Sequence, residues 1–150
     1  AGCYLLEREV LASLSSEKHS MERVVFPEIA KIGKMAGLEF KGYFVDAGTP
    51  SSFIEAAQVC ISNNRFSVGE SRGDNWFHDI NVDFSSQISG SSISKGVSIG
   101  KDCEINDCVI LSGAIIGDGC KLNRCLIGES SLIKNNSDFS DRVIGHNESV

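Results

Sequence analysis

In the second half of the sequence, apolar residues recur in a pattern with a period of seventeen residues. From Val82 onward an apolar residue recurs at steps of six, five and six positions, although serine, glycine, asparagine and charged residues dominate between these positions. Because three such steps add up to seventeen, equivalent apolar residues fall into three registers. The twelve residues that follow this rule are Val82, Ile88, Ile93, Ile99, Ile105, Ile110, Ile116, Leu122, Ile127, Ile133, Phe139 and Ile144.

Three registers predict a coil with three flat sides, each of which contributes one inward-pointing residue per turn. A helical period of 3.6 residues cannot produce this spacing, and neither can the alternation of one long strand. One short strand per side, with successive coils stacked at the ~4.8 Å spacing of β-strands, does produce it. The six-residue steps, such as IGKDCE and IGDGCK, resemble the hexapeptide repeats of left-handed parallel β-helices. We therefore expect a left-handed β-helix of about four coils over residues 82–150.

Four of the six cysteines follow the same register. Cys103 and Cys120 are separated by one full period, and so are Cys108 and Cys125. This spacing predicts stacked small apolar side chains that fill the angles of the triangular coil. A thiol metal site is the alternative, which the lack of a histidine at ligand spacing disfavours. Because the first residues do not have the pattern of a signal peptide, we expect all six thiols to be reduced.

The segment before the coils, residues 1–62, has a different pattern. Apolar runs predict strands over residues 1–6, 35–40 and 42–46. Helical spacing and capping residues predict helices over residues 7–14, 21–32 and 50–61. Strands that alternate with helices predict an α/β layer over residues 1–62. The weak periodicity of residues 63–81 predicts an irregular connector before the coils.

One acidic residue lies at the end of an expected strand. Asp46 is followed by the sequence Ala-Gly-Thr-Pro, which opens the third expected helix. In open α/β sheets ligands bind at the carboxyl ends of the strands, where a carboxylate can hold Mg²⁺ together with phosphate oxygens. A turn or helix-capping aspartate is the alternative that the spacing leaves open.

Three motifs occur in order before the coils. They are AGCYLLEREVL at the start, SMERVVFPEIA over residues 20–30 and GYFVDAGTPSSFIEAAQ over residues 42–58. Together they resemble the sugar-1-phosphate nucleotidyltransferases, and the S-x-E-x-x-x-F-P element of the second motif is most similar to the mannose-1-phosphate guanylyltransferase branch. The resemblance implies that residues 1–62 are the C-terminal part of a Rossmann-like nucleotidyltransferase domain. It also implies synthesis of a nucleotide sugar, GDP-mannose in this branch, and pyrophosphate from a nucleoside triphosphate and a sugar 1-phosphate.

The same resemblance implies roles for three residues. It places the backbone of Gly2 near the sugar phosphate and the carboxylate of Glu22 against the sugar hydroxyls. It makes Asp46 a catalytic residue that holds Mg²⁺, the cofactor that we expect. Phosphoryl and nucleotidyl transfer need such an ion to neutralise phosphate oxygens and align the attack. The alternatives are a tight backbone position for Gly2 and a favourable helix-dipole interaction for Glu22.

The sequence departs from the family pattern in one major respect. It contains no glycine-rich phosphate loop between a strand and a helix. We therefore expect the chain to be a C-terminal fragment that is inactive alone. A non-catalytic oligomerisation module and a glucose-1-phosphate adenylyl-, thymidylyl- or uridylyltransferase are the alternatives. A coil-based acyltransferase or carbonic anhydrase is less favoured, because His146 is the one histidine well inside the repeat.

Charge and composition limit the partners. The net charge of −6 disfavours nucleic acid and anionic membranes as partners. No apolar run approaches the ~20 residues that span a bilayer, so we expect a cytoplasmic protein. The open strand edges of a short coil predict a homo-oligomer that assembles through the β-helix.

Overall fold

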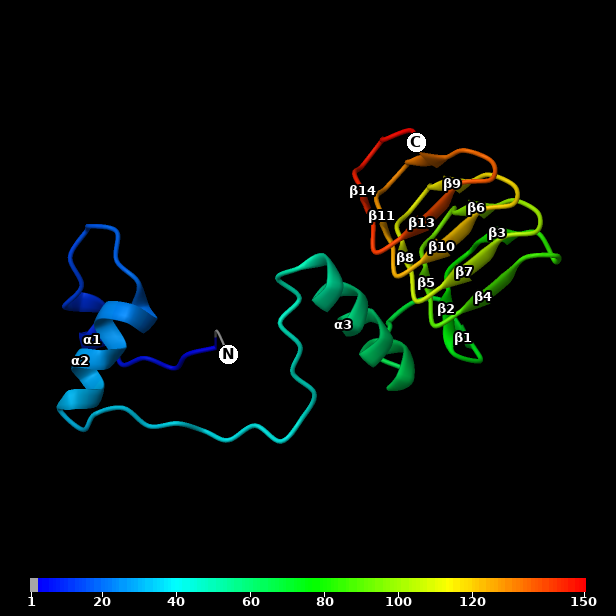
Figure 1. Cartoon of the computed structure of the whole chain (residues 1–150). Coiled ribbons are helices and arrows are strands. Elements are labelled where there is room, and N and C mark those ends of the chain that lie inside the picture. Colours follow the sequence, from blue (N-terminus) through cyan, green and yellow to red (C-terminus); the bar gives the residue numbers. More distant parts are fainter. Residues whose placement is uncertain (1–2) are drawn as a thin grey trace. The chain divides into compact units, whose positions relative to one another are not determined.

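The computed structural model describes residues 3–150. The chain divides into two compact units, Ala1–Lys41 and Gly42–Val150. The second unit contains a parallel β-solenoid of about four coils, drawn from green to red in Figure 1. Its strands are β3 (Asn81–Val82), β4 (Gln87–Ser89), β5 (Ser92–Ile93), β6 (Ser98–Ile99), β7 (Glu104–Asn106), β8 (Val109–Ile110), β9 (Ile115–Ile116), β10 (Lys121–Asn123), β11 (Leu126–Ile127), β12 (Leu132–Ile133), β13 (Asp138–Ser140) and β14 (Val143–Ile144).

These strands form the three sides that the three registers predict. The sheets have the orders β3-β6-β9-β12, β4-β7-β10-β13 and β5-β8-β11-β14, and every neighbouring pair is parallel. Each residue pairs with its equivalent one period later, as Ile99 pairs with Ile116 and Ile105 with Leu122. The repeat in the sequence is therefore the repeat of the fold.

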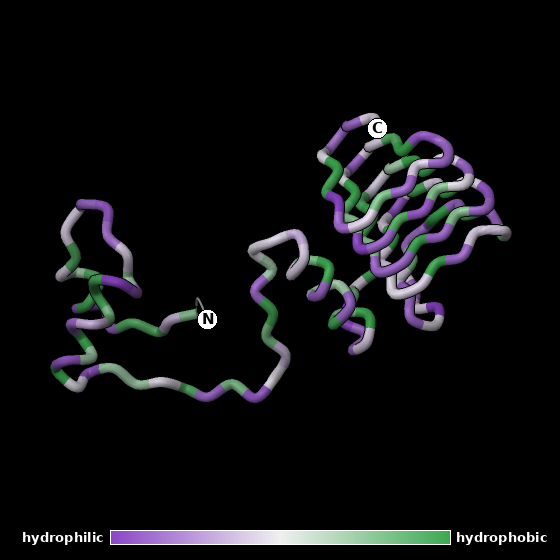
Figure 2. Tube along the Cα trace, in the orientation of Figure 1, coloured by the Kyte–Doolittle hydropathy of each residue, from purple (hydrophilic) through white to green (hydrophobic). Residues whose placement is uncertain are grey.

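The twelve apolar residues of the repeat point into the coil and form its core. Nine of them are buried, and Val82, Ile88 and Phe139 are half-buried against the same cluster. Figure 2 shows hydrophobic and hydrophilic residues alternating along each coil. The predicted inward register is confirmed, because every one of its positions belongs to the core.

The four cysteines of the coils fill its corners. Cys103, Cys108, Cys120 and Cys125 are buried, and all six cysteines are free. The thiols of Cys103 and Cys120 each donate to a carbonyl oxygen of the next coil at 3.1 Å. Burial raises the pKa of the Cys120 thiol, which keeps this donor protonated. The packing interpretation is confirmed, because all four thiols belong to the buried core cluster of the coils.

A β-hairpin precedes the first coil, where the sequence analysis expects an irregular connector. β1 (Glu70–Arg72) pairs antiparallel with β2 (Asn75–Phe77), and β2 continues the solenoid by pairing parallel with β5. The expectation is wrong for these residues. Phe77 pairs with Ile93, one position short of the full period, so the period does not reveal this pairing. Trp76 and Phe77 are buried, and the Trp76 ring stacks on Phe66 at 4.6 Å.

Helix α3 (Pro50–Ser62) lies in the same unit as the coils. It begins at a capping box, in which the Thr49 hydroxyl accepts from the Ser52 N–H and the Ser52 hydroxyl accepts from the Thr49 N–H. Its apolar face buries Ile54 and Ile61. The helix that the sequence predicts over residues 50–61 is confirmed.

The described part of the first unit, residues 3–41, contains only short helical segments. They are α1 (Arg8–Ala12), the π-helical turn η1 (Met21–Val25) and α2 (Phe26–Lys31). The strands expected over residues 1–6, 35–40 and 42–46 are wrong as far as the structure describes them, since residues 3–69 contain no strand. A strand needs a hydrogen-bonding neighbour, and no described segment pairs with these residues. Most of the described side chains in these segments are exposed, as Leu38 at 97% and Phe40 at 74% show. The domain boundaries expected at residues 62 and 81 stay a prediction.

The core register predicts that the same substitution lowers the stability of the protein by very different amounts at two adjacent isoleucines of β9. Ile116 is 2% exposed, and Ile116→Asp places an unpaired carboxylate among apolar side chains. We expect it to lower the free energy of unfolding by about 4 kcal/mol or more. Ile115 points outward and is 50% exposed, so Ile115→Asp should cost less than about 1 kcal/mol. Urea unfolding followed by circular dichroism measures both, and equal midpoints would contradict the inward register.

Candidate functional site

The carboxylate of Glu22 is held from both sides by hydroxyl groups. The Tyr4 hydroxyl donates to Oε1 at 2.5 Å, and the Ser20 hydroxyl donates to Oε2 at 3.1 Å. Each oxygen of an ionised carboxylate offers about two acceptor positions, so both oxygens can still accept a further donor. Glu22 is exposed and thus accessible to a ligand.

These contacts also favour the charged form of Glu22. The hydrogen bond from Tyr4 holds the pKa of the Glu22 carboxyl below its usual value, and a backbone hydrogen bond and Ser20 lower it further. The same hydrogen bond raises the pKa of the Tyr4 hydroxyl, so that Tyr4 remains the donor. At neutral pH the site therefore presents an oriented, ionised acceptor, which suits the hydroxyl groups of a sugar.

The local sequence explains why these groups meet. Ser20 is the N-cap of η1, where its hydroxyl oxygen accepts from the Arg23 N–H. Glu22 stands in the first turn after this cap. The Tyr4 ring packs edge-on against Phe26, with ring centroids 4.7 Å apart, and Phe26 is buried at the start of α2. Two of the motifs in the sequence are thus joined in space, because Tyr4 belongs to the first and Glu22 to the second.

The sequence analysis missed the contribution of Tyr4. It proposes the backbone of Gly2 as the part of the first motif near the sugar, and Gly2 lies outside the described residues. Tyr4 stands two positions later in the same AGCY segment. The sequence showed a tyrosine close to the glycine of this segment. Nothing in the spacing of the motifs indicates which side chain this tyrosine contacts.

Asp46 lies in a different environment. It is exposed, it follows an extended segment, and it comes just before the Thr49 cap of α3. A Cβ atom at Gly48 would lie 3.3 Å from Oδ1 of Asp46, so a small residue suits this turn. Glu22 belongs to the first unit and Asp46 to the second.

The carboxylate of Asp46 could supply one ligand of a Mg²⁺ site. Mg²⁺ is commonly bound by one or two carboxylates together with waters and phosphate oxygens. The exposed carboxylate of Asp46 fits one such ligand. No group of three potential ligands occurs in residues 3–150, so any ion held by Asp46 needs further oxygen atoms from phosphate, water or other carboxylates.

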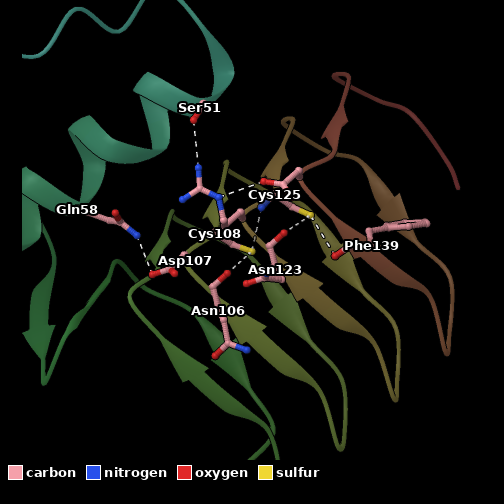
Figure 3. A network of polar contacts seen from close by, with 10 residues as sticks. Ser51, Gln58, Asn106, Asp107, Cys108, Asn123, Cys125 and Phe139 are labelled. Carbon is pink, nitrogen blue, oxygen red and sulfur yellow. Dashed lines mark hydrogen bonds and ion pairs between the residues drawn. The ribbon is translucent and has the colours of Figure 1, made fainter.

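Helix α3 is fastened to the turns of the solenoid by two polar contacts (Figure 3). Gln58 Nε2 donates to Asp107 Oδ1 at 2.7 Å, and an Arg124 guanidinium nitrogen donates to the Ser51 hydroxyl at 3.1 Å. Arg124 also forms an ion pair with Asp141 at 3.0 Å. The helix that follows Asp46 and Thr49 is therefore positioned by the coils.

The turn residues in this contact share one position of the repeat. Asp107, Arg124 and Asp141 follow one another at the period of the coils and have φ angles of 51°, 51° and 52°, in the left-handed region. The sequence analysis followed only the apolar registers and missed this polar column. The same period would have revealed it, although not the helix that it binds.

The histidine of the coils has a structural contact. His146 Nδ1 accepts a hydrogen bond from the Glu129 N–H at 3.0 Å, which joins equivalent turns of two coils. This contact gives His146 a role in the stacking of the turns. Across the described residues, no helix has the length and apolar character needed to cross a membrane.

Comparison with known families agrees with the coil geometry. Residues 80–149 match the family model described as GlmU-like, C-terminal hexapeptide. The coils are a GlmU-like hexapeptide domain. The chain also shows a likeness to a solved structure, a mutant of perosamine N-acetyltransferase from Caulobacter crescentus in complex with CoA and GDP-perosamine. That likeness has a TM-score of 0.51 at 18% identity and covers 85% of this chain and 66% of the other, so it shows the fold alone.

Curated relatives confirm the resemblance to mannose-1-phosphate guanylyltransferases. The mannose-1-phosphate guanyltransferase of Eremothecium gossypii is 27% identical over 92 residues, which cover 60% of this chain and 26% of the relative. The probable mannose-1-phosphate guanylyltransferase 2 of Oryza sativa subsp. japonica is 33% identical over 75 residues, which cover 46% of this chain and 21% of the relative. The match thus spans about a quarter of the length of these relatives. This weak homology and the hexapeptide domain make the chain a nucleotidyltransferase-related module.

The contact between α3 and the hexapeptide domain can be tested by hydrogen exchange. Gln58→Ala removes the donor to the Asp107 carboxylate, and a hydrogen bond to a charged group contributes enough to shift an opening equilibrium about tenfold. We expect amide exchange over residues 50–62 to accelerate about tenfold, while exchange in the coils stays unchanged. Glu55→Ala, an exposed position on the same helix, is the control. Mass spectrometry that finds equal rates in the two variants would contradict the contact.

Proposed function

We propose that this chain is part of a sugar-1-phosphate nucleotidyltransferase that makes a nucleotide sugar and pyrophosphate from a nucleoside triphosphate and a sugar 1-phosphate. GDP-mannose is the product that the relatives favour, since the matched proteins are named mannose-1-phosphate guanylyltransferases. The observation that carries the proposal is the Glu22 carboxylate, which two motifs of the sequence hold in an oriented, ionised state.

Glu22 is the proposed sugar-binding residue. A carboxylate that already accepts one donor on each oxygen has a fixed direction for its remaining acceptor positions. Sugar hydroxyls are donors that can occupy them. These hydroxyls do not change during nucleotidyl transfer, so this contact stabilises the bound substrate and the transition state alike.

Asp46 is the proposed metal-binding residue. When bound, Mg²⁺ would neutralise phosphate oxygens and orient the attack on the nucleotide phosphorus. The part of Asp46 is to supply one carboxylate oxygen from the turn before α3. The Thr49 cap and the contacts of α3 with the coils keep that turn at the side of the hexapeptide domain.

The hexapeptide domain is proposed to assemble the enzyme into a homo-oligomer. β13 and β14 are the last strands of their sheets, whereas residues 148–150 pair with β12. The open edges of β13 and β14 favour pairing with another copy. Light scattering at micromolar concentration tests this. A clean monomer would exclude assembly through the coils.

The sugar and the base are tested by substrate panels. The protein that contains this chain should form a nucleotide sugar and pyrophosphate fastest from GTP and mannose 1-phosphate. Preference for glucose 1-phosphate with ATP, dTTP or UTP would assign the alternative adenylyl-, thymidylyl- or uridylyltransferase activity. Absence of turnover with every pair would leave the non-catalytic oligomerisation module.

Two substitutions separate the roles of Asp46 and Glu22. Asp46→Asn keeps the size but removes the charge that binds the metal, so kcat should fall by about 100-fold or more with a small change in KM for the sugar phosphate. Glu22→Gln weakens a contact that stabilises the bound substrate and the transition state equally. KM for the sugar phosphate should therefore rise about tenfold with kcat nearly unchanged. Steady-state kinetics measures both parameters.

The controls for these two variants are the same substitutions at exposed positions outside the proposed site. Asp138→Asn and Glu55→Gln alter exposed carboxylates and should leave both parameters unchanged. Each variant must melt within a few degrees of the parent protein. Near-normal turnover of Asp46→Asn would make Asp46 a turn residue and remove the metal assignment.

A further inference from the structure

The Tyr4 hydroxyl makes one of the shortest side-chain contacts of the first unit, and nothing in the sugar-binding role of Glu22 requires it. Its partner is Oε1 of Glu22 at 2.5 Å, across 18 residues of sequence. The Tyr4 ring is in turn supported by the edge-on contact with Phe26. Phe26 is 8% exposed, so the ring rests on a buried side chain.

The other carboxylate oxygen is held from the helical side. The Ser20 oxygen accepts from the Arg23 N–H, and the Ser20 hydroxyl donates to Oε2 of Glu22 at 3.1 Å. The Ser20 contact is local, because cap and carboxylate are two residues apart. Tyr4 is therefore the group that ties the direction of the carboxylate to a different segment of the chain.

We propose that Tyr4 is a positioning residue, whose hydroxyl fixes the Glu22 carboxylate in the orientation that accepts the hydroxyl groups of a sugar 1-phosphate. The inference rests on the proposed function of Glu22. Tyr4 acts through Glu22 and needs no contact of its own with the sugar. Without its hydroxyl, an exposed glutamate side chain samples several rotamers, and substrate binding must then restrict them.

Tyr4→Phe is the variant that tests this role. It keeps the ring and its contact with Phe26 and removes only the donor. We expect KM for the sugar 1-phosphate to rise about tenfold and kcat to change by less than about twofold, in the nucleotidyltransferase that contains this chain. Ser13→Ala is the control, because it removes a hydroxyl of the same unit that donates to the Val10 carbonyl at 2.7 Å. It should leave KM unchanged.

A double-variant comparison shows whether Tyr4 acts through Glu22. If it does, Tyr4→Phe adds nothing to the KM of Glu22→Gln, because the carboxylate that it orients is already altered. A KM of the double variant that rises by the product of the two single effects would mean that Tyr4 contacts the sugar itself. This result would overturn the positioning role. An unchanged KM in Tyr4→Phe alone would overturn the inference while the proposed function stands.

A measurement without substrate separates the inference from the proposed function. NMR titration of carboxyl-labelled glutamate in the isolated chain should find the pKa of Glu22 below its usual value, and Tyr4→Phe should raise it. Equal pKa values in the two proteins would show that the hydrogen bond does not hold the carboxylate, which overturns the inference. Absence of turnover by the unmutated enzyme would overturn the proposed function, and the role in sugar binding with it.

Discussion

The stacking of equivalent residues from coil to coil is the interaction on which the rest of the structure depends. The Gly100 N–H donates to the Ile116 carbonyl, and one coil further along the Gly117 N–H donates to the Ile133 carbonyl in the same pattern. Each of these bonds places an inward apolar side chain directly over its equivalent. At Gly128 a Cβ would lie 2.5 Å from the carbonyl carbon of Gly145, so the close approach of the coils also dictates where glycine stands. Backbone hydrogen bonds and core packing thus impose the same period.

This period extends to the surface, where it creates a ladder of polar turns that a helix can bind. Ser51 and Gln58 are seven residues apart, which separates them by about 10 Å along α3. Their partners Arg124 and Asp107 lie one coil apart, a distance of about 4.8 Å. The long side chain of Arg124 covers the difference, whereas the shorter Asp107 meets the long Gln58. A helix is therefore held at the side of the solenoid although the two structures have unrelated periods.

The coils could be predicted from the sequence because every turn buries the same kind of residue at the same spacing. The hairpin of β1 and β2 was not predicted, because the separation in sequence between paired residues of β2 and β5 is one position shorter than the period. The expected strands near Phe40 and Asp46 failed for another reason, since their apolar pattern describes a segment that needs a neighbour in a sheet. At the candidate site, sequence motifs predicted a role for Glu22 but could not reveal Tyr4 as its partner, because that contact depends on how the chain returns after 18 residues.

The surroundings of Glu22 and Asp46 suit them to different ligands. Glu22 already accepts hydroxyl donors on both oxygens, which spreads its charge and fixes the direction of the acceptor positions that remain. Such a carboxylate attracts a cation more weakly, and it is better preorganised to accept hydrogen bonds from neutral hydroxyl groups. Asp46 is exposed, and within its own unit, residues 42–150, no side chain donates a hydrogen bond to its carboxylate, which leaves both oxygens open to other ligands. The proposed division between sugar binding and metal binding is therefore supported by the different hydrogen bonding around two chemically equivalent groups.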